Sequence, residues 1–170
     1  MRYDAVVDLF AEVVALTAAL DAASIDYAIC GGVALAVHGA PRATKDIDLL
    51  AREVDLPRLR EVVRSRGFTI EALPMTFSSS GISICRFTKI EPDGRTLMLD
   101  VWLAEGPLES VWQTRARVAF AAIEAIEAPG SALWVVSRDG LITLKLAAGR
   151  PQDIVDIQRL QEASRGEHDI

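Results

Sequence analysis

Apolar side chains recur every three or four positions over the first part of the chain. The positions concerned are Val6, Leu9, Phe10, Val13, Val14, Leu16 and Leu20. This spacing predicts an amphipathic helix that ends near Ala23 and packs across a sheet. Because Asp8 and Glu12 interrupt the apolar stretch, and no basic start or cleavage site accompanies it, we expect neither a signal peptide nor a membrane span, and a cytoplasmic location.

A strand, a glycine pair and a short helix are predicted next. Residues 27–30 form an apolar run that ends at Gly31 and Gly32, and residues 33–38 look helical until a breaker at 39–41. After the breaker, apolar residues at 47, 49 and 50 alternate with Asp46 and Asp48. Such alternation predicts a strand with one apolar and one polar face.

The remaining pattern predicts a mixed sheet flanked by helices, that is, an α/β (α+β) fold. Residues 82–90 and 96–103 read as two strands joined by the Pro92-Asp93-Gly94-Arg95 turn. Short strand-like pieces lie around 117–120 and 133–136. Helices are expected at 56–65, 138–148 and 152–163, and the polar residues 164–170 are expected to fray.

Length and composition favour a single domain. The 170 residues are 51% hydrophobic and 25% charged, which suits one globular core. We expect its centre at about residues 25–104, with a C-terminal helical element at about 138–163. Two cysteines, Cys30 and Cys85, lie in apolar surroundings and are expected to be reduced.

The charge balance limits the kinds of partner. A net charge of −6 and a pI near 4.9 exclude a protein built mainly to coat nucleic acid, since phosphate neutralisation needs surplus cations. Arginines do gather at positions 52, 58, 60, 64 and 66. They are typical of a solvated helix face, and they form the basic surface to test if the protein acts on RNA.

Three aspartates are the candidate chemical centre. On a strand, Asp46 and Asp48 point to the same side, and their repulsion would be relieved by a hard cation such as Mg²⁺ or Mn²⁺. Asp100 lies among apolar neighbours, where a carboxylate needs a metal or another partner. It could complete a two-metal site and accept a proton. The alternatives are a solvated strand face for the first pair, and an arginine or backbone partner for Asp100.

Phosphate-binding groups are expected around this centre. Gly31 and Gly32 close a strand and open a helix, a geometry that lets amide groups approach phosphate oxygens. Arg42, Thr44 and Lys45 lie just before the aspartate pair, where a positive charge would meet a triphosphate. A solvated loop is the alternative for these three residues.

These motifs together resemble the nucleotidyltransferase superfamily that includes DNA polymerase β. Its signature is a hydrophobic residue, a glycine, and then a glycine or serine, followed after some ten residues by a strand with an acidic residue on either side of a hydrophobic one. Residues 30–32 and 46–49 match this signature, and Asp100 is similar to the family's later third aspartate. The resemblance implies the nucleotidyltransferase fold, divalent metals at the three aspartates and an NTP substrate.

A longer match narrows the resemblance to AbiEii-type toxins and related minimal nucleotidyltransferases. It covers residues 27–35, His38-Gly39, Arg42, Thr44 and 46–48, and a C-terminal element with Lys145, Arg150, Asp153 and Asp156. The family implies roles for Lys145 and Asp153 at the nucleotide. The alternative is a local ion-pair group that anchors the last helix.

The resemblance implies transfer of NMP from an NTP to an acceptor hydroxyl. The acceptor would be RNA or tRNA, a protein or a small molecule, and an antitoxin is a candidate partner. Two other functions remain open. One is an inactive nucleotide- or partner-binding module of the same fold, and the other is an aminoglycoside-type enzyme whose acidic cleft attracts cationic substrates.

Overall fold

The computed structural model describes residues 2–119 and 132–166. In these ranges eight strands form one mixed sheet in the order β3-β5-β6-β2-β1-β8-β7, with β4 paired to β5. The strands are β1 Ala28–Cys30, β2 Ile47–Ala51, β3 Ile70–Glu71, β4 Met75–Thr76, β5 Ser83–Ile90, β6 Thr96–Leu103, β7 Ala116–Ala119 and β8 Ala132–Val135. The predicted mixed α/β fold is therefore confirmed.

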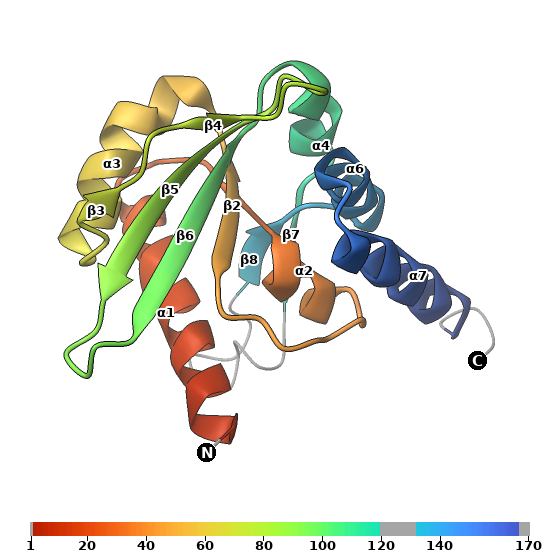
Figure 1. The fold of residues 1–170 in the computed structure, drawn as a ribbon, viewed down its shortest axis with the longest axis horizontal. Coiled ribbons are helices and arrows are strands. Elements are labelled where there is room, and N and C mark those ends of the chain that lie inside the picture. The colour runs from red at the N-terminus through yellow and green to blue at the C-terminus, as the bar shows by residue number, and fades with distance from the viewer. Residues whose placement is uncertain (1, 120–131, 167–170) are drawn as a thin grey trace.

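Helices flank this sheet (Figure 1). They are α1 Arg2–Ala22, α2 Gly31–Val37, α3 Leu56–Ser65, α4 Glu109–Gln113, α6 Arg138–Ala148 and α7 Pro151–Gly166, with 3-10 turns η1 Glu53–Asp55 and η2 Gly106–Leu108. In Figure 1, α1 and α3 lie toward the β3-β5 side, and α6 and α7 lie beyond the other side. No helix in the described ranges has the length and apolar character that a membrane span requires.

Local sequence signals explain where the well-predicted helices begin and end. Helix α3 has Pro57 in its first turn, and Gly67 follows its end with a φ of +94°. Helix α6 begins after Ser137, whose hydroxyl accepts a hydrogen bond of 3.0 Å from the Gly140 amide. It ends at Gly149, which has a φ of +63° and separates it from α7.

The core lies between the sheet and its helices. Buried side chains include Leu16 and Leu20 of α1 and Leu59 of α3, together with Leu49 of β2 and Val101 of β6. Cys30 and Cys85 are buried and free, as predicted. This packing fixes β2 and β6 at the centre of the sheet, and those two strands carry two of the three candidate aspartates.

Several predicted boundaries need correction. Helix α2 begins at Gly31 itself, so the glycine pair forms its first turn and does not precede it. Strand β2 begins at Ile47, which leaves Asp46 just outside the strand. Residues 164–166, expected to fray, continue α7. The predicted strand end at 120 and the tail at 167–170 lie outside the described residues.

Candidate active site

Four side chains form a row across the centre of the sheet. Cys30 on β1 is the register partner of Asp48 on β2, Asp48 is the partner of Asp100 on β6, and Asp100 is the partner of Arg86 on β5. Register partners on neighbouring strands project from the same face. All four line one cleft, so the sheet itself brings residues 30, 48, 86 and 100 together.

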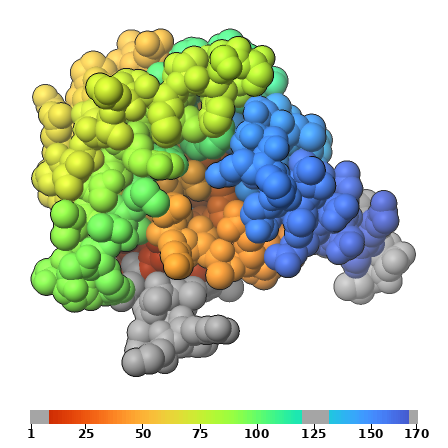
Figure 2. Space-filling view, viewed as in Figure 1, coloured from red at the N-terminus to blue at the C-terminus, as the bar shows by residue number. Residues whose placement is uncertain are grey.

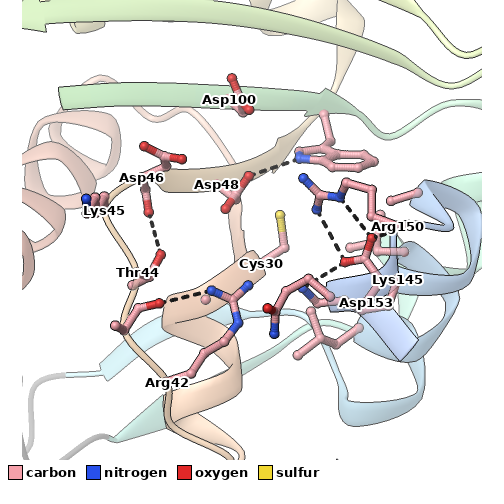
Figure 3. A pocket seen from close by; sticks show the side chains of 18 of the residues that line it. Cys30, Arg42, Thr44, Lys45, Asp46, Asp48, Asp100, Lys145, Arg150 and Asp153 are labelled. Carbon is pink, nitrogen blue, oxygen red and sulfur yellow. Dashed lines mark hydrogen bonds and ion pairs between the residues drawn. The ribbon is translucent and has the colours of Figure 1, made fainter. Parts of the chain in front are cut away.

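The cleft has a volume of about 410 Å³ and contains every residue that the sequence singled out as a site residue. These are Gly31, Gly32, Arg42, Thr44, Asp46, Asp48, Asp100, Lys145 and Asp153. Figure 2 shows a hollow between the β5–β6 hairpin and the α6–α7 pair, with the α2–β2 segment at its base. Figure 3 shows the three candidate aspartates on one side of the cleft. Lys145, Arg150 and Asp153 lie on the other side.

Asp48 lies at the floor of the cleft against Gly31. A Cβ added at Gly31 would lie 2.0 Å from Oδ2 of Asp48, and Gly31 has a φ of +62°. The other carboxylate oxygen, Oδ1, accepts a hydrogen bond of 3.3 Å from the indole nitrogen of Trp102. Burial, followed by the charge of Asp100, raises the pKa of Asp48 to about 6. The ionised form of Asp48 is therefore energetically unfavourable in the metal-free cleft.

Asp46 reaches the same cleft from the segment before β2. Thr44 braces this segment through its hydroxyl, which donates to the Asp46 carbonyl oxygen at 3.4 Å. Burial, and then the nearby charge of Asp100, raises the pKa of the Asp46 carboxyl. Since Asp46 precedes the strand, the two aspartates share the cleft through the bend at the strand's start, and strand alternation alone does not explain it.

Asp100 is only 8% exposed, and its partner is Arg86. Nε of Arg86 donates to Oδ1 of Asp100 at 2.7 Å, and Nη2 donates to Oδ2 at 2.8 Å. This two-pronged geometry is the strong form of an arginine–carboxylate pair. The structure therefore contains the arginine partner that the sequence left as the alternative for Asp100, beside the carboxylates that would bind a metal.

Lys145, predicted to contact phosphate, lies in a buried ion-pair network. Its ammonium nitrogen donates to Asp153 at 3.2 Å and to Asp156 at 2.8 Å, and only 4% of the residue is exposed. Asp156 also accepts from Nε of Arg42 at 2.9 Å, and Asp153 from Nε of Arg150 at 2.9 Å. These contacts tie α6, α7 and the segment before β2 into one wall of the cleft.

From the sequence, Arg86 and Trp102 had no place in the site, and Arg150 was left between a nucleotide role and a helix anchor. Arg86 pairs with Asp100, and the indole nitrogen of Trp102 donates to Asp48. Arg150, read as an equal candidate for a helix anchor, keeps 65% of its side chain exposed while paired to Asp153. The strand register of the hairpin is the signal that would have revealed Arg86 and Asp100 as partners.

The donor groups of the cleft suit a hard divalent cation. Asp46 and Asp48 offer carboxylates whose pKa values are raised by burial and then by the charge of Asp100, and a cation would relieve that cost. In the ranges 2–119 and 132–166, no three acidic, histidine or cysteine side chains are close enough together to enclose a metal ion. Both oxygens of Asp100 are bonded to Arg86. The fit is therefore good at Asp46 and Asp48 and requires a rearrangement at Asp100.

The close contact between Gly31 and Asp48 yields a prediction about stability. We expect Gly31→Ala to destabilise the fold by roughly 2–4 kcal/mol, because it adds a steric clash with Asp48 to the cost of a positive φ. Gly81→Ala is the matched control, since Gly81 has a φ of +71° with nothing within 4 Å of the added Cβ. Urea unfolding of both variants measures the difference. Equal losses would contradict the close approach.

The raised pKa of Asp48 yields a prediction about pH. Its folded pKa of about 6 lies above the ordinary value of 3.8, so the folded state binds the proton more tightly than the unfolded state. Stability of the metal-free protein should therefore decline as pH rises from about 4 to above 6, by about 3 kcal/mol from this group. Unfolding with a chelator present measures it. Asp48→Asn should lose this part of the slope, and an unchanged slope would contradict the assignment.

Solved structures with a similar fold include nucleotidyltransferases. A lincosamide antibiotic adenylyltransferase, LnuA, aligns with a TM-score of 0.53 and 11% identity, covering 89% of this chain and 96% of its own. The enzyme ANT(2")-Ia, solved with adenylyl-2"-tobramycin, aligns with a TM-score of 0.54 and 18% identity, covering 95% and 91%. At these identities the likeness establishes the fold, and the nucleotidyltransferase fold expected from the sequence is confirmed.

The family follows from the sequence profile. The profile of the nucleotidyl transferase AbiEii toxin family, of type IV toxin–antitoxin systems, matches residues 14–170. No curated protein matches the sequence significantly. The chain belongs to the AbiEii nucleotidyltransferase family, and family and fold together make it a nucleotidyltransferase.

Proposed function

We propose that the cleft transfers a nucleoside monophosphate from an NTP to an acceptor hydroxyl and releases pyrophosphate. The observation that supports this most is the pairing of Asp48 with Asp100 at the floor of a cleft that also carries many cations. Of the charged residues lining it, Arg42, Lys45, Arg86, Lys145 and Arg150 are basic and Asp46, Asp48, Asp100 and Asp153 are acidic. Carboxylates beside cations suit a metal-bound triphosphate.

In the proposed reaction, the oxygen of the acceptor hydroxyl forms a bond to the α-phosphorus. The bond from that phosphorus to the oxygen bridging to the β-phosphate breaks, and pyrophosphate leaves with the electron pair. The hydroxyl proton passes to a carboxylate of the cleft. Bound Mg²⁺ or Mn²⁺ would neutralise charge on the phosphates and on the attacking and leaving oxygens.

The proposed roles of the cleft residues are of three kinds: binding the metal, contacting the phosphates and supporting the wall of the cleft. Asp46 and Asp48 would hold the divalent cation, and Asp100 would join them and accept the proton once Arg86 releases one of its oxygens. Gly31 and Gly32 would lie along the triphosphate at the first turn of α2. Lys45 and Arg150 are exposed cations on the cleft wall and would meet the phosphates directly.

Lys145, Asp153 and Arg42 would act mainly by holding the wall in place. Each is engaged in the buried network, and Lys145 already has two carboxylate partners. A buried lysine in that setting contributes positive potential toward the cleft without leaving its partners. We therefore assign direct contact with phosphate to Arg150 before Lys145.

Identifying the acceptor that receives the nucleotide would distinguish the three functions left open by the sequence. Purified protein should be incubated with Mg²⁺, each NTP labelled at the α-phosphate, and three acceptor pools: tRNA, proteins and aminoglycosides. We expect label on an RNA or protein acceptor, since five basic side chains against four acidic ones make the cleft a poor attractor for a cationic antibiotic. Label on the aminoglycoside would favour the small-molecule enzyme. No label on any pool, with NTP binding intact, would favour the inactive module.

Such an activity would suit the toxin of a toxin–antitoxin pair, which the family description names. An antitoxin would then be the regulatory partner of this chain. Expression of the wild-type gene should slow growth of a host, and Asp48→Asn should not. Equal toxicity of the two forms would argue that toxicity comes from something other than this cleft.

A further inference from the structure

Arg86 is the basic member of the row of cleft residues, and its charge neutralises Asp100. It lies on β5, directly opposite Asp100 on β6, while Asp48 lies opposite Asp100 on the other side. The order along the sheet is therefore cation, anion, anion. Arg86 keeps 36% of its side chain exposed to the cleft, whereas Asp100 keeps only 12%. The guanidinium is thus the more accessible member of the pair, and the carboxylate is the more buried one.

The pairing uses every charged oxygen that Asp100 has. Oδ1 and Oδ2 each accept one guanidinium hydrogen bond, at 2.7 Å and 2.8 Å. A cation that binds Asp100 must take an oxygen from Arg86 or share it. Breaking such a pair leaves a guanidinium that needs a new partner. An NTP would bring phosphate oxygens into this cleft, and the planar guanidinium fork of arginine can bind two of them at once.

We propose that Arg86 competes with the divalent cation for Asp100, and that metal binding frees it to contact the phosphates of the nucleotide. This inference rests on the proposed function, since it assumes that the cleft binds a divalent cation. Arg86 would then be a positioning residue that holds Asp100 in place in the metal-free protein. It also delays assembly of the three-carboxylate site until the nucleotide supplies a second partner.

The competition has a direct consequence for metal affinity. With Arg86 removed, the cleft loses a positive charge next to the metal site and Asp100 gains free oxygens. We expect Arg86→Gln to bind Mn²⁺ at least roughly tenfold more tightly than wild type when no nucleotide is present. Arg86→Lys keeps the charge and loses the two-pronged geometry, so its affinity should lie between the two.

The test is Mn²⁺ titration of the chelator-treated, nucleotide-free full chain, with free Mn²⁺ measured by electron paramagnetic resonance. Arg52→Gln is the matched control, because Arg52 also forms a two-pronged pair, with Glu109, but lies outside the cleft. It should bind Mn²⁺ as wild type does. In thermal unfolding, Mn²⁺ should raise the melting temperature of Arg86→Gln more than that of wild type. If Arg86→Gln does not fold, the intermediate affinity of Arg86→Lys carries the test.

The outcomes separate this inference from the proposed function. Mn²⁺ binding by wild type that Asp48→Asn abolishes, without tighter binding by either Arg86 variant, overturns the competition and leaves the metal site standing. Weaker binding by Arg86→Gln than by wild type also overturns it, because Arg86 would then support the site. If neither wild type nor the Arg86 variants bind Mn²⁺, the proposed metal site fails, and this inference fails with it.

Discussion

Replacing Asp48 by asparagine should lower metal-dependent nucleotidyl transfer by on the order of 10³-fold or more and yet stabilise the metal-free fold. Asn keeps the size of the side chain but removes the charge that would hold the cation. It also removes the anion that burial and Asp100 disfavour, as the pKa of about 6 indicates. The gain in stability should be about 3 kcal/mol at pH 8.

Pyrophosphate release and urea unfolding measure the two effects on the same preparation. Asp93→Asn is the control, because Asp93 lies in the exposed β5–β6 turn and pairs with Arg95. It should change neither the rate nor the stability to a comparable extent. Full turnover by Asp48→Asn would contradict the metal assignment. A lower stability than wild type at pH 8 would contradict the account of its electrostatics.

Lys145→Met should lower the free energy of unfolding by about 3 kcal/mol or more. Lys145 is almost fully buried, and it neutralises Asp153 and Asp156, whose side chains are 1% and 0% exposed. Methionine fills much of the same space but leaves both carboxylates with one cation fewer. Arg42 and Arg150 remain as partners, so we expect a destabilised fold rather than an unfolded chain.

Arg64→Met is the control for this second prediction. Arg64 pairs with Glu71 at 3.1 Å, but its side chain is 54% exposed, and pairs of that kind contribute little. Denaturant unfolding should show a change below about 1 kcal/mol for Arg64→Met. Adding Asp156→Asn to Lys145→Met should recover part of the loss. Equal unfolding midpoints for Lys145→Met and wild type would show that the network does not hold the wall.

The helices were largely predictable because their signals are local. Pro57 and Gly67 bracket α3, and Ser137 and Gly149 bracket α6, so the boundaries follow from caps and breakers near in sequence. The short strands β3 and β4 were not predicted. Each has only two residues, and both exist because β5 offers an edge for pairing. Periodicity cannot be read from two positions.

The partner of Asp100 was not predictable, because it depends on hairpin register. The predicted strands, 82–90 and 96–103, fit the observed register, but the turn signal at residues 92–95 also allows a register shifted by one residue, in which Arg86 would pair with Val101. In the structure Ile90 pairs with Thr96, and Arg86 therefore pairs with Asp100. A shift of one residue would move Arg86 off the face of Asp100. The composition of the turn does not determine this register.

The sequence identified the residues of the C-terminal ion pairs, but it left their role open. The sequence presented Lys145, Arg150, Asp153 and Asp156 as either nucleotide ligands or a helix anchor. Burial favours the anchor role at Lys145, since α6 and α7 pack together around it. Exposure leaves Arg150 accessible from the cleft. Spacing along one helix gives no information about which member faces solvent.

The most direct test of the account is a crystal structure with Mn²⁺ and a non-hydrolysable NTP analogue, with the metal located by anomalous scattering. We predict Mn²⁺ bonded to carboxylate oxygens of Asp46 and Asp48, with the triphosphate along Gly31 and Gly32 and near Arg150. Metal and nucleotide bound together at another surface, with Asp46 and Asp48 in contact with neither, would contradict the assignment of this cleft as the active site.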